Sequence, residues 1–68
     1  MTKFRNNDRR IIAVAAKAAQ LDPAGFFIEV EPDGIIVNHQ ESMKWPAATR
    51  AEVERQVKEF TGMNVWVT

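Results

Sequence analysis

Residues 26–38 constrain the fold of this chain more than any other segment. Two runs of apolar and β-branched residues, 26–30 and 35–37, flank an Asp33-Gly34 pair. Asp-Gly between alternating apolar runs is a strong short-range signal for a β-hairpin, because both residues tolerate the positive φ angles of tight hairpin turns. The sequence therefore predicts two antiparallel strands against which the remaining residues must pack.

The register of this hairpin decides which side chains share a face. A two-residue Asp33-Gly34 turn pairs Val30 with Val37 and keeps carboxylates out of the core, so we expect it rather than a three-residue loop at 32–34, which would pair Glu29 with Val37. The core face of the expected hairpin carries Phe26, Ile28, Val30, Ile35 and Val37. Its opposite face carries Phe27, Glu29, Glu31, Ile36 and Asn38.

A first helix is expected before the hairpin, ending at about Gln20. Asn6, Asn7 and Asp8 are its N-cap candidates, because their short polar side chains accept hydrogen bonds from the first free amides. Residues 22–25, Asp-Pro-Ala-Gly, end it. Its apolar positions recur at helical spacing, at Ile11, Val14 or Ala15, Ala18 and Leu21.

A second helix and a third strand are expected after the loop at residues 40–46. Thr49 and Glu52 have the spacing of a capping box, and Gly62 stands where a C-terminal glycine belongs. The helix would bury Val53, Val57 and Phe60. Residues 63–67 alternate as a strand, with Met63, Val65 and Val67 towards the helices and Trp66 facing away.

These elements predict one α+β domain over residues 1–68, in the order helix, strand, strand, helix, strand. Each helix has a single apolar stripe, so two helices pack on one face of a three-stranded sheet and leave the other face uncovered. The chain has 68 residues and no cysteine. A chain this short gains stability from association when disulfides are lacking, so we expect a homodimer.

The uncovered sheet face is the main candidate for function. Phe27, Ile36 and Trp66 would form an apolar patch within a rim of Glu29, Glu31, Asn38 and Asn64. An apolar centre with a polar rim is typical of a protein interface. The alternative is that Phe4, or the loop with Met43 and Trp45, covers this face. Trp45 itself either seals the start of the second helix or anchors a partner.

Charge is distributed unevenly along a chain of zero net charge. Residues 21–42 contain five acidic residues and no Lys or Arg, whereas residues 1–20 contain a single acidic residue, Asp8. The basic residues of this first segment are Lys3, Arg5, Arg9, Arg10 and Lys17. They make nucleic-acid binding the alternative function, since cations recognise phosphates. The carboxylates near the uncovered face argue against base stacking there.

Nothing in the sequence predicts catalysis, a metal or a cofactor. His39, Glu41 and Ser42 are neighbours on one loop, where a nucleophile, base and orienting acid rarely align. We expect His39 to be a surface residue at the end of a strand. No apolar run is long enough for a membrane span and no signal peptide is recognised, so we expect a cytoplasmic protein without a membrane partner.

The order of elements is similar to that of the bacterial BON and type II KH modules. The Gly-x-x-Gly clamp with which KH modules hold nucleic acid has no counterpart here, because the three glycines are far apart. Residues 9–38, with their alanine-rich helix and hairpin, resemble small uncharacterised proteins of bacteriophage and prophage genomes. This resemblance implies a non-enzymatic accessory protein, regulator or inhibitor that binds a host or phage macromolecule.

Overall fold

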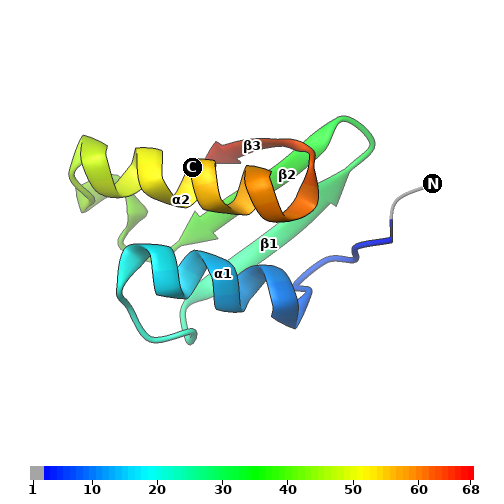
Figure 1. Ribbon diagram of the computed structural model, residues 1–68. Helices are drawn as coiled ribbons and strands as arrows, with labels where there is room; N and C mark the ends of the chain where they lie inside the picture. Colours follow the sequence, from blue (N-terminus) through cyan, green and yellow to red (C-terminus); the bar gives the residue numbers. More distant parts are fainter. Residues whose placement is uncertain (1–2) are drawn as a thin grey trace.

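Two helices lie side by side on one face of a three-stranded sheet (Figure 1). The computed structural model describes residues 3–68. Its elements are α1 (Arg9–Ala19), β1 (Phe26–Glu31), β2 (Gly34–His39), a short 3-10 helix at Ser42–Lys44, α2 (Ala47–Thr61) and β3 (Asn64–Val67). This arrangement confirms the predicted α+β class and the order of its elements.

The sheet has the strand order β1-β2-β3. β1 and β2 form the antiparallel hairpin, whereas β2 and β3 are parallel. Parallel neighbours need a long crossover, and α2 supplies it. β2 is therefore the central strand, and β1 and β3 are the two edges.

The core lies between the sheet and the helices. α1 contributes two buried alanines, Ala15 and Ala16, whose small side chains add little bulk to this core. The fully or nearly fully buried apolar residues of the helices and strands are Ile11, Ala15, Ala16, Phe26, Ile28, Ile35, Val37, Val53, Val57 and Val65. Neither helix of the described residues is long and apolar enough to cross a membrane.

The predicted register of the hairpin is wrong by two residues. Val30 pairs with Ile35, and the turn consists of Pro32 and Asp33 between the paired residues Glu31 and Gly34. Proline fixes a negative φ and favours the first central position of a turn, and neither Asp33 nor Gly34 has a positive φ. Because side chains alternate with a period of two, a shift of two residues leaves the predicted faces correct.

The helix starts differ in how well the sequence predicted them. Asp8 is the N-cap of α1, and its carboxylate accepts from the Arg10 N–H at 3.0 Å. α2 begins at Ala47 after Pro46 and has no side-chain cap, so the predicted capping box of Thr49 and Glu52 is wrong. The proline, which is compatible with the start of a helix, allows α2 to begin before Thr49.

Two predictions of burial, for Phe60 and His39, are also wrong, and Leu21, an apolar position assigned to the first helix, lies outside it. Phe60 is 45% exposed because it lies near the end of α2, where its ring packs beside that of Phe4 with centroids 5.8 Å apart. Leu21 is exposed because α1 ends at Ala19, before Leu21 can continue the helical face. His39 is only 7% exposed, since its ring packs on Phe26 with centroids 4.5 Å apart.

Candidate functional site

The sheet face opposite the helices carries the three apolar side chains that the sequence assigned to it. We call Phe27, Ile36 and Trp66 the open face. Phe27 is 59% exposed and Trp66 is 43% exposed, and Ile36 is partly buried between their strands. Ile36 on β2 is in register with Trp66 on β3, while Phe27 on β1 is in register with Asn38. All three strands therefore contribute to one apolar surface.

Polar groups surround the open face. The Asn38 side-chain amide donates to the carbonyl oxygen of Thr68 at 3.2 Å and to its hydroxyl oxygen at 3.1 Å. Glu29 lies beside Ile36 in the neighbouring strand. A hollow of about 350 Å³ opens between Phe27, Ile36, Asn38 and Thr68. An apolar centre with a satisfied polar rim is the usual composition of a protein interface.

None of the predicted internal covers lies over the open face in the described residues. Phe4 is buried on the helix side, with its ring 5.8 Å from that of Phe60. Met43 is almost fully exposed. Trp45 packs against Phe26, whose side chain belongs to the core face. The exposed aromatic rings of the open face are thus left to solvent.

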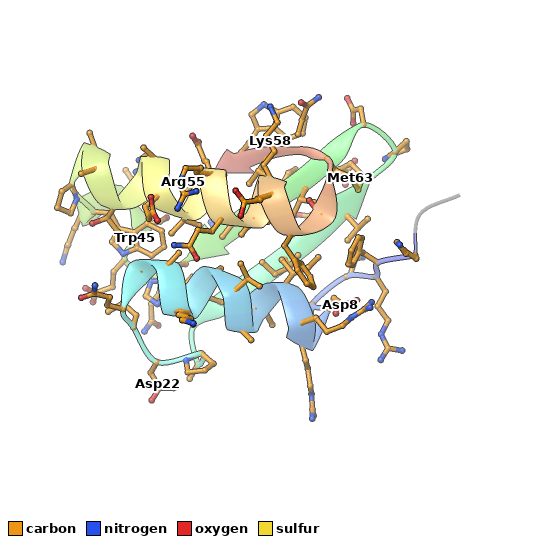
Figure 2. The ribbon with its side chains drawn as sticks, viewed as in Figure 1. Asp8, Asp22, Trp45, Arg55, Lys58 and Met63 are labelled. Atoms are coloured by element: carbon orange, nitrogen blue, oxygen red, sulfur yellow. The ribbon has the colours of Figure 1, made fainter. Side chains whose placement is uncertain are left out.

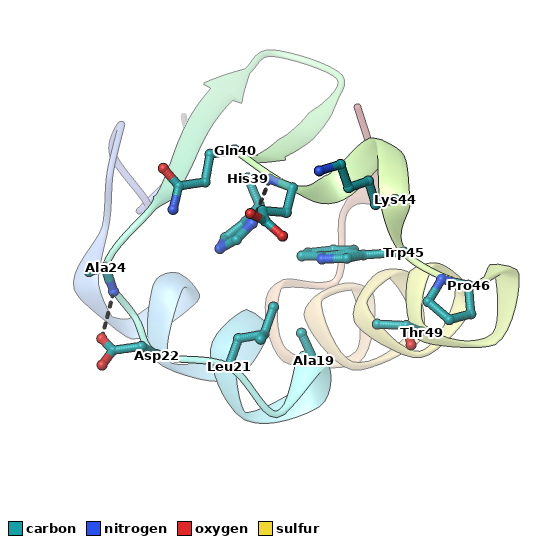
Figure 3. Close-up of a pocket in the computed structure, with 11 residues that line it drawn as sticks. Ala19, Leu21, Asp22, Ala24, His39, Gln40, Lys44, Trp45, Pro46 and Thr49 are labelled. Carbon is teal, nitrogen blue, oxygen red and sulfur yellow. Dashed lines mark hydrogen bonds between the residues drawn. The ribbon is translucent and has the colours of Figure 1, made fainter.

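Trp45 lies in a separate region, beside a pocket of about 470 Å³ between the end of α1 and the start of α2. Its ring stacks obliquely on His39, with centroids 5.3 Å apart (Figure 3). The His39 Nδ1 atom accepts from the Glu41 N–H at 3.0 Å, and the Trp45 Nε1 atom is buried without an acceptor in the described residues. Trp45 therefore packs at the end of the core, next to α2. The sequence did not predict this pocket, since its walls come from distant segments.

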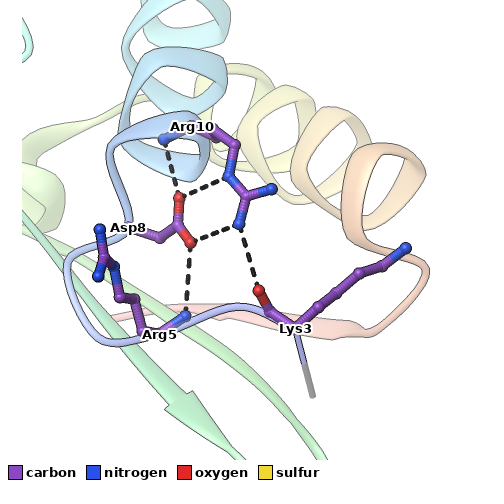
Figure 4. Close-up of polar contacts among 4 residues, drawn as sticks. All are labelled: Lys3, Arg5, Asp8 and Arg10. Carbon is purple, nitrogen blue, oxygen red and sulfur yellow. Dashed lines mark hydrogen bonds and ion pairs between the residues drawn. The ribbon is translucent and has the colours of Figure 1, made fainter.

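The basic residues of the N-terminal part fall into two groups. Arg10 is held by Asp8 through contacts of 3.0 Å from Nε and 2.9 Å from Nη2, and Nη2 also donates to the Lys3 carbonyl at 3.2 Å (Figure 4). Its guanidinium also lies 5.0 Å from the centre of the Phe4 ring. Arg10 is therefore engaged in holding the N-terminal segment against α1.

This ion pair changes the acidity of both partners. The Arg10 side chain is the main cause that holds the pKa of Asp8 well below its usual range, and hydrogen bonds from the backbone N–H groups of Arg10 and Arg5 act in the same direction. The hydrogen bond to Asp8 raises the pKa of Arg10. Asp8 is consequently ionised, and it places a negative charge at the centre of the basic segment.

The other basic residues remain exposed, and the structure brings only some of them together. Lys3, Arg5 and Arg9 lie around one hollow of about 430 Å³ with Asp8 and Arg10. Lys17 is two helical turns beyond Arg10, or about 10 Å along the axis. The basic surface is consequently small and contains a carboxylate.

His39 ends β2 and Ser42 begins the short helix after it, and both side chains make hydrogen bonds within the fold. The Ser42 hydroxyl donates to the Thr68 carbonyl, so it holds the C-terminal end of β3. Residues 3–68 contain no group of three or more histidine or carboxylate side chains placed to hold a metal ion.

Comparisons with models of protein families, with curated proteins and with solved structures found no significant match to this chain. The resemblance of residues 9–38 to small phage-genome proteins, and of the element order to BON and KH modules, stays a prediction.

Proposed function

We propose that this protein is a small binding module that recognises another protein through its open face. One observation carries the proposal. Phe27 and Trp66 remain 59% and 43% exposed on the side of the sheet that no helix covers, with Ile36 between their strands. Each large apolar side chain gains about 1.5–3 kcal/mol when it is fully removed from water. A partner with an apolar surface would supply that burial.

The sheet is well suited to hold these side chains in place. Aromatic residues dominate the binding energy of many interfaces when they lie on a rigid surface, because little conformational entropy is lost on binding. Ile36 belongs to the central strand, which is paired on both sides. The binding surface would therefore be preorganised.

A module of this kind acts by occupying a surface of its partner, so an accessory, regulatory or inhibitory role follows from the proposal. A cytoplasmic location is part of it, because the chain contains no cysteine and so needs no oxidising compartment. Trp45 is excluded from the proposed surface, since its ring packs against Phe26 and His39 near the pocket beside α2.

Nucleic-acid binding through Lys3, Arg5 and Arg9 is the second candidate. These three side chains are exposed around one hollow, which favours contact with phosphate. The ionised Asp8 and its pairing with Arg10 reduce the positive charge available there. The protein-binding proposal is therefore preferred.

Site-specific photocrosslinking tests the proposal. A photoreactive residue is placed at Phe27 and, as the control, at the almost fully exposed Met43, which lies off the open face. We expect a protein to be captured at position 27 but not at 43. The purified partner should then bind Phe27→Ser about tenfold more weakly than the parent, and Met43→Ser equally well.

Salt dependence separates the two candidates. Binding through an apolar face should change little between about 50 and 200 mM salt, whereas binding to several phosphates weakens steeply. The proposal is overturned if Phe27→Ser leaves every detected association unchanged. Binding that is lost in Arg5→Ala and Arg9→Ala, and that falls with salt, would establish the nucleic-acid candidate instead.

A further inference from the structure

The two edges of the sheet are treated differently, and the edge at β1 is closed by the chain itself. The Asn7 N–H donates to the Ile28 carbonyl at 2.7 Å, and the Ile28 N–H donates to the Asn7 side-chain oxygen at 2.9 Å. The Val30 N–H donates to the Asn6 side-chain oxygen at 2.8 Å. The segment before α1 thus satisfies the outward N–H groups of Ile28 and Val30 and the Ile28 carbonyl, and it occupies the place of a further strand at the middle of β1.

The edge at β3 is open. The Thr68 N–H donates to the Val37 carbonyl at 2.9 Å, so the alternate residues Val65 and Val67 turn their backbone groups away from β2. Arg50 donates to the Val67 carbonyl at 2.9 Å, and this oxygen keeps a second lone pair. Within residues 3–68, no hydrogen bond is made by the outward N–H groups of Val65 and Val67 or by the outward carbonyl of Val65. An edge of this kind is a template for another strand.

Apart from Arg50 at the Val67 carbonyl, side chains leave this edge accessible. The Trp66 ring lies over Gly34 of β2 and hence away from the outer edge of β3. A groove of about 520 Å³ runs between the edge and α2, with Ala51, Glu54, Lys58 and Val65 among its walls. Lys58 is seen on the side of α2 next to β3 (Figure 2). A strand could therefore approach β3 along the groove.

We propose that the occupant of this edge is a second copy of the chain. β3 pairs antiparallel with β3 of the second copy about a two-fold axis at Trp66, and the two sheets become one continuous sheet. The sequence Val65-Trp66-Val67 reads the same in both directions. Each Val65 then faces Val67 of the other copy, and their N–H and carbonyl groups form two reciprocal pairs of hydrogen bonds.

The same two-fold axis places opposite charges of the two copies near each other beside the edge. Glu54 and Lys58 stand one turn apart on the groove side of α2, and neither takes part in an ion pair within residues 3–68. Arg55 is already paired with Glu52 at 2.7 Å. Four residues of a helix span about 6 Å, close to the span of two residues in a strand. The two-fold axis therefore brings Glu54 of each copy towards Lys58 of the other.

This pairing goes beyond the proposed function and does not depend on it. It uses backbone groups of β3 and charges of α2, whereas the open face extends across the sheet to Phe27 on β1. In the dimer, the open faces of both copies would lie on the same side of one sheet. A partner would then meet an apolar surface twice as wide.

A charge-reversal cycle on the full chain tests the pairing. Sedimentation equilibrium at low salt compares the parent with Glu54→Lys, Lys58→Glu and the double variant. The symmetric dimer has two contacts between Glu54 and Lys58, and each single reversal places like charges opposite each other in both. We therefore expect a dimer that is about tenfold weaker. The double variant restores opposite charges, and its dimer should be within about threefold of the parent. Both side chains lie on the surface of α2, and circular dichroism checks that each variant is folded.

Amide hydrogen exchange is the second measurement. The Val65 and Val67 amides should exchange more slowly as protein concentration rises, while the Ile28 and Val30 amides, already bonded to Asn7 and Asn6, stay unchanged. The proposal is wrong if the chain remains monomeric up to millimolar concentration. It is also wrong if a dimer forms whose affinity is unchanged by either single charge reversal and in which the Val65 amide exchanges as fast as in the monomer. A dimer that is lost in Phe27→Ser alone would overturn the edge pairing and support association through the open face.

Discussion

The indole ring of Trp66 covers Gly34 so closely that a Cβ atom added to Gly34 would lie 2.3 Å from the ring carbon Cζ3. Gly34 is part of β2 and does not need a positive φ. Glycine weakens strands unless a neighbouring group approaches its backbone. Here the approaching group is Trp66, which is held partly over the sheet and presents its remaining surface on the open face.

The contact between Gly34 and Trp66 predicts a large effect of a small substitution. Gly34→Ala should lower the free energy of unfolding by about 2 kcal/mol, because the added methyl group forces the ring and the strand apart. Urea unfolding measures this loss. The control is Gly62→Ala, where nothing lies within 4 Å of the added Cβ and only the positive φ of 72° opposes it, at a cost of about 1 kcal/mol.

The substitution Gly34→Ala in a Trp66→Ala variant separates the clash with the indole ring from the clash with the Asn64 carbonyl oxygen. In Trp66→Ala, the cost of Gly34→Ala should shrink without vanishing, since the Asn64 carbonyl oxygen would still lie 2.7 Å from the added Cβ. An equal cost in both backgrounds would mean that the indole ring is not the obstacle.

Asn7 is predicted to protect the edge of β1. Asn7→Gly keeps the positive φ of 56° accessible but removes the acceptor of the Ile28 N–H, so we expect a loss of about 1 kcal/mol and faster exchange of that amide. Asn7→Ala should cost more, because alanine tolerates this backbone conformation poorly. If the Ile28 amide stays as protected as in the parent, the Asn7 side chain does not close the edge.

Asp8 is predicted to make the protein sensitive to acid. Its pKa in the folded chain lies below the usual value of about 3.9, chiefly because Arg10 donates to it. The unfolded chain then binds the proton more readily, so stability is lost as the pH falls below about 4. Asp8→Asn removes this contribution. The difference in urea midpoint between parent and variant should be constant above about pH 5 and narrow towards lower pH.

Glu52 offers a comparison on the surface. Hydrogen bonds from Arg55 and, to a lesser extent, Gln56 lower the pKa of Glu52 to about 2, but Glu52 and Arg55 are substantially exposed. Protonation of Glu52 should therefore also lower the stability of the fold as the pH falls, but by less than protonation of Asp8, because solvent screens the exposed pair. A midpoint difference for Asp8→Asn that does not change with pH would contradict the role given to the Arg10 pair.

Arg50 is predicted to need both terminal nitrogens of its guanidinium group. Nη1 donates to the Val67 carbonyl at 2.9 Å and Nη2 donates to the Ser42 carbonyl at 2.6 Å, which ties β3 to the short helix before α2. Lysine cannot reproduce this fork, so Arg50→Lys should cost about 1–2 kcal/mol in urea unfolding. Arg55→Lys, at an exposed ion pair, should cost less than about 0.5 kcal/mol. Equal losses would show that the bridge does not stabilise the fold.

Local patterns were enough to predict the elements and their faces. The alternation of residues 26–31 and 34–39 predicts two strands. Phe27 and Ile36 lie on the same side whether Val30 pairs with Val37, as predicted, or with Ile35, as observed, because the two registers differ by two residues. The spacing of Val53 and Val57 predicts a buried helix face. Periodicity depends only on backbone geometry, which every residue of an element shares, so these predictions were confirmed.

Such patterns could not predict which of several similar residues makes a given contact. Asn6, Asn7 and Asp8 are all good N-cap residues, but only Asp8 caps α1, while the two asparagines bond to β1. That outcome depends on the distance between the N-terminal segment and a strand about twenty residues away. In the same way, His39 is buried because Phe26 and Trp45 converge on it from other segments.

By itself, the sequence of this protein determined the type and order of its helices and strands, and which side chains of each strand share a face, because these properties arise from repeats of two and 3.6 residues along the chain. Only the tertiary structure decided that Gly34 makes room for Trp66, and that the N-terminal segment bonds to the edge of β1 while the edge of β3 stays open. Each of these depends on the approach of groups distant in sequence, and close packing allows only one arrangement of them.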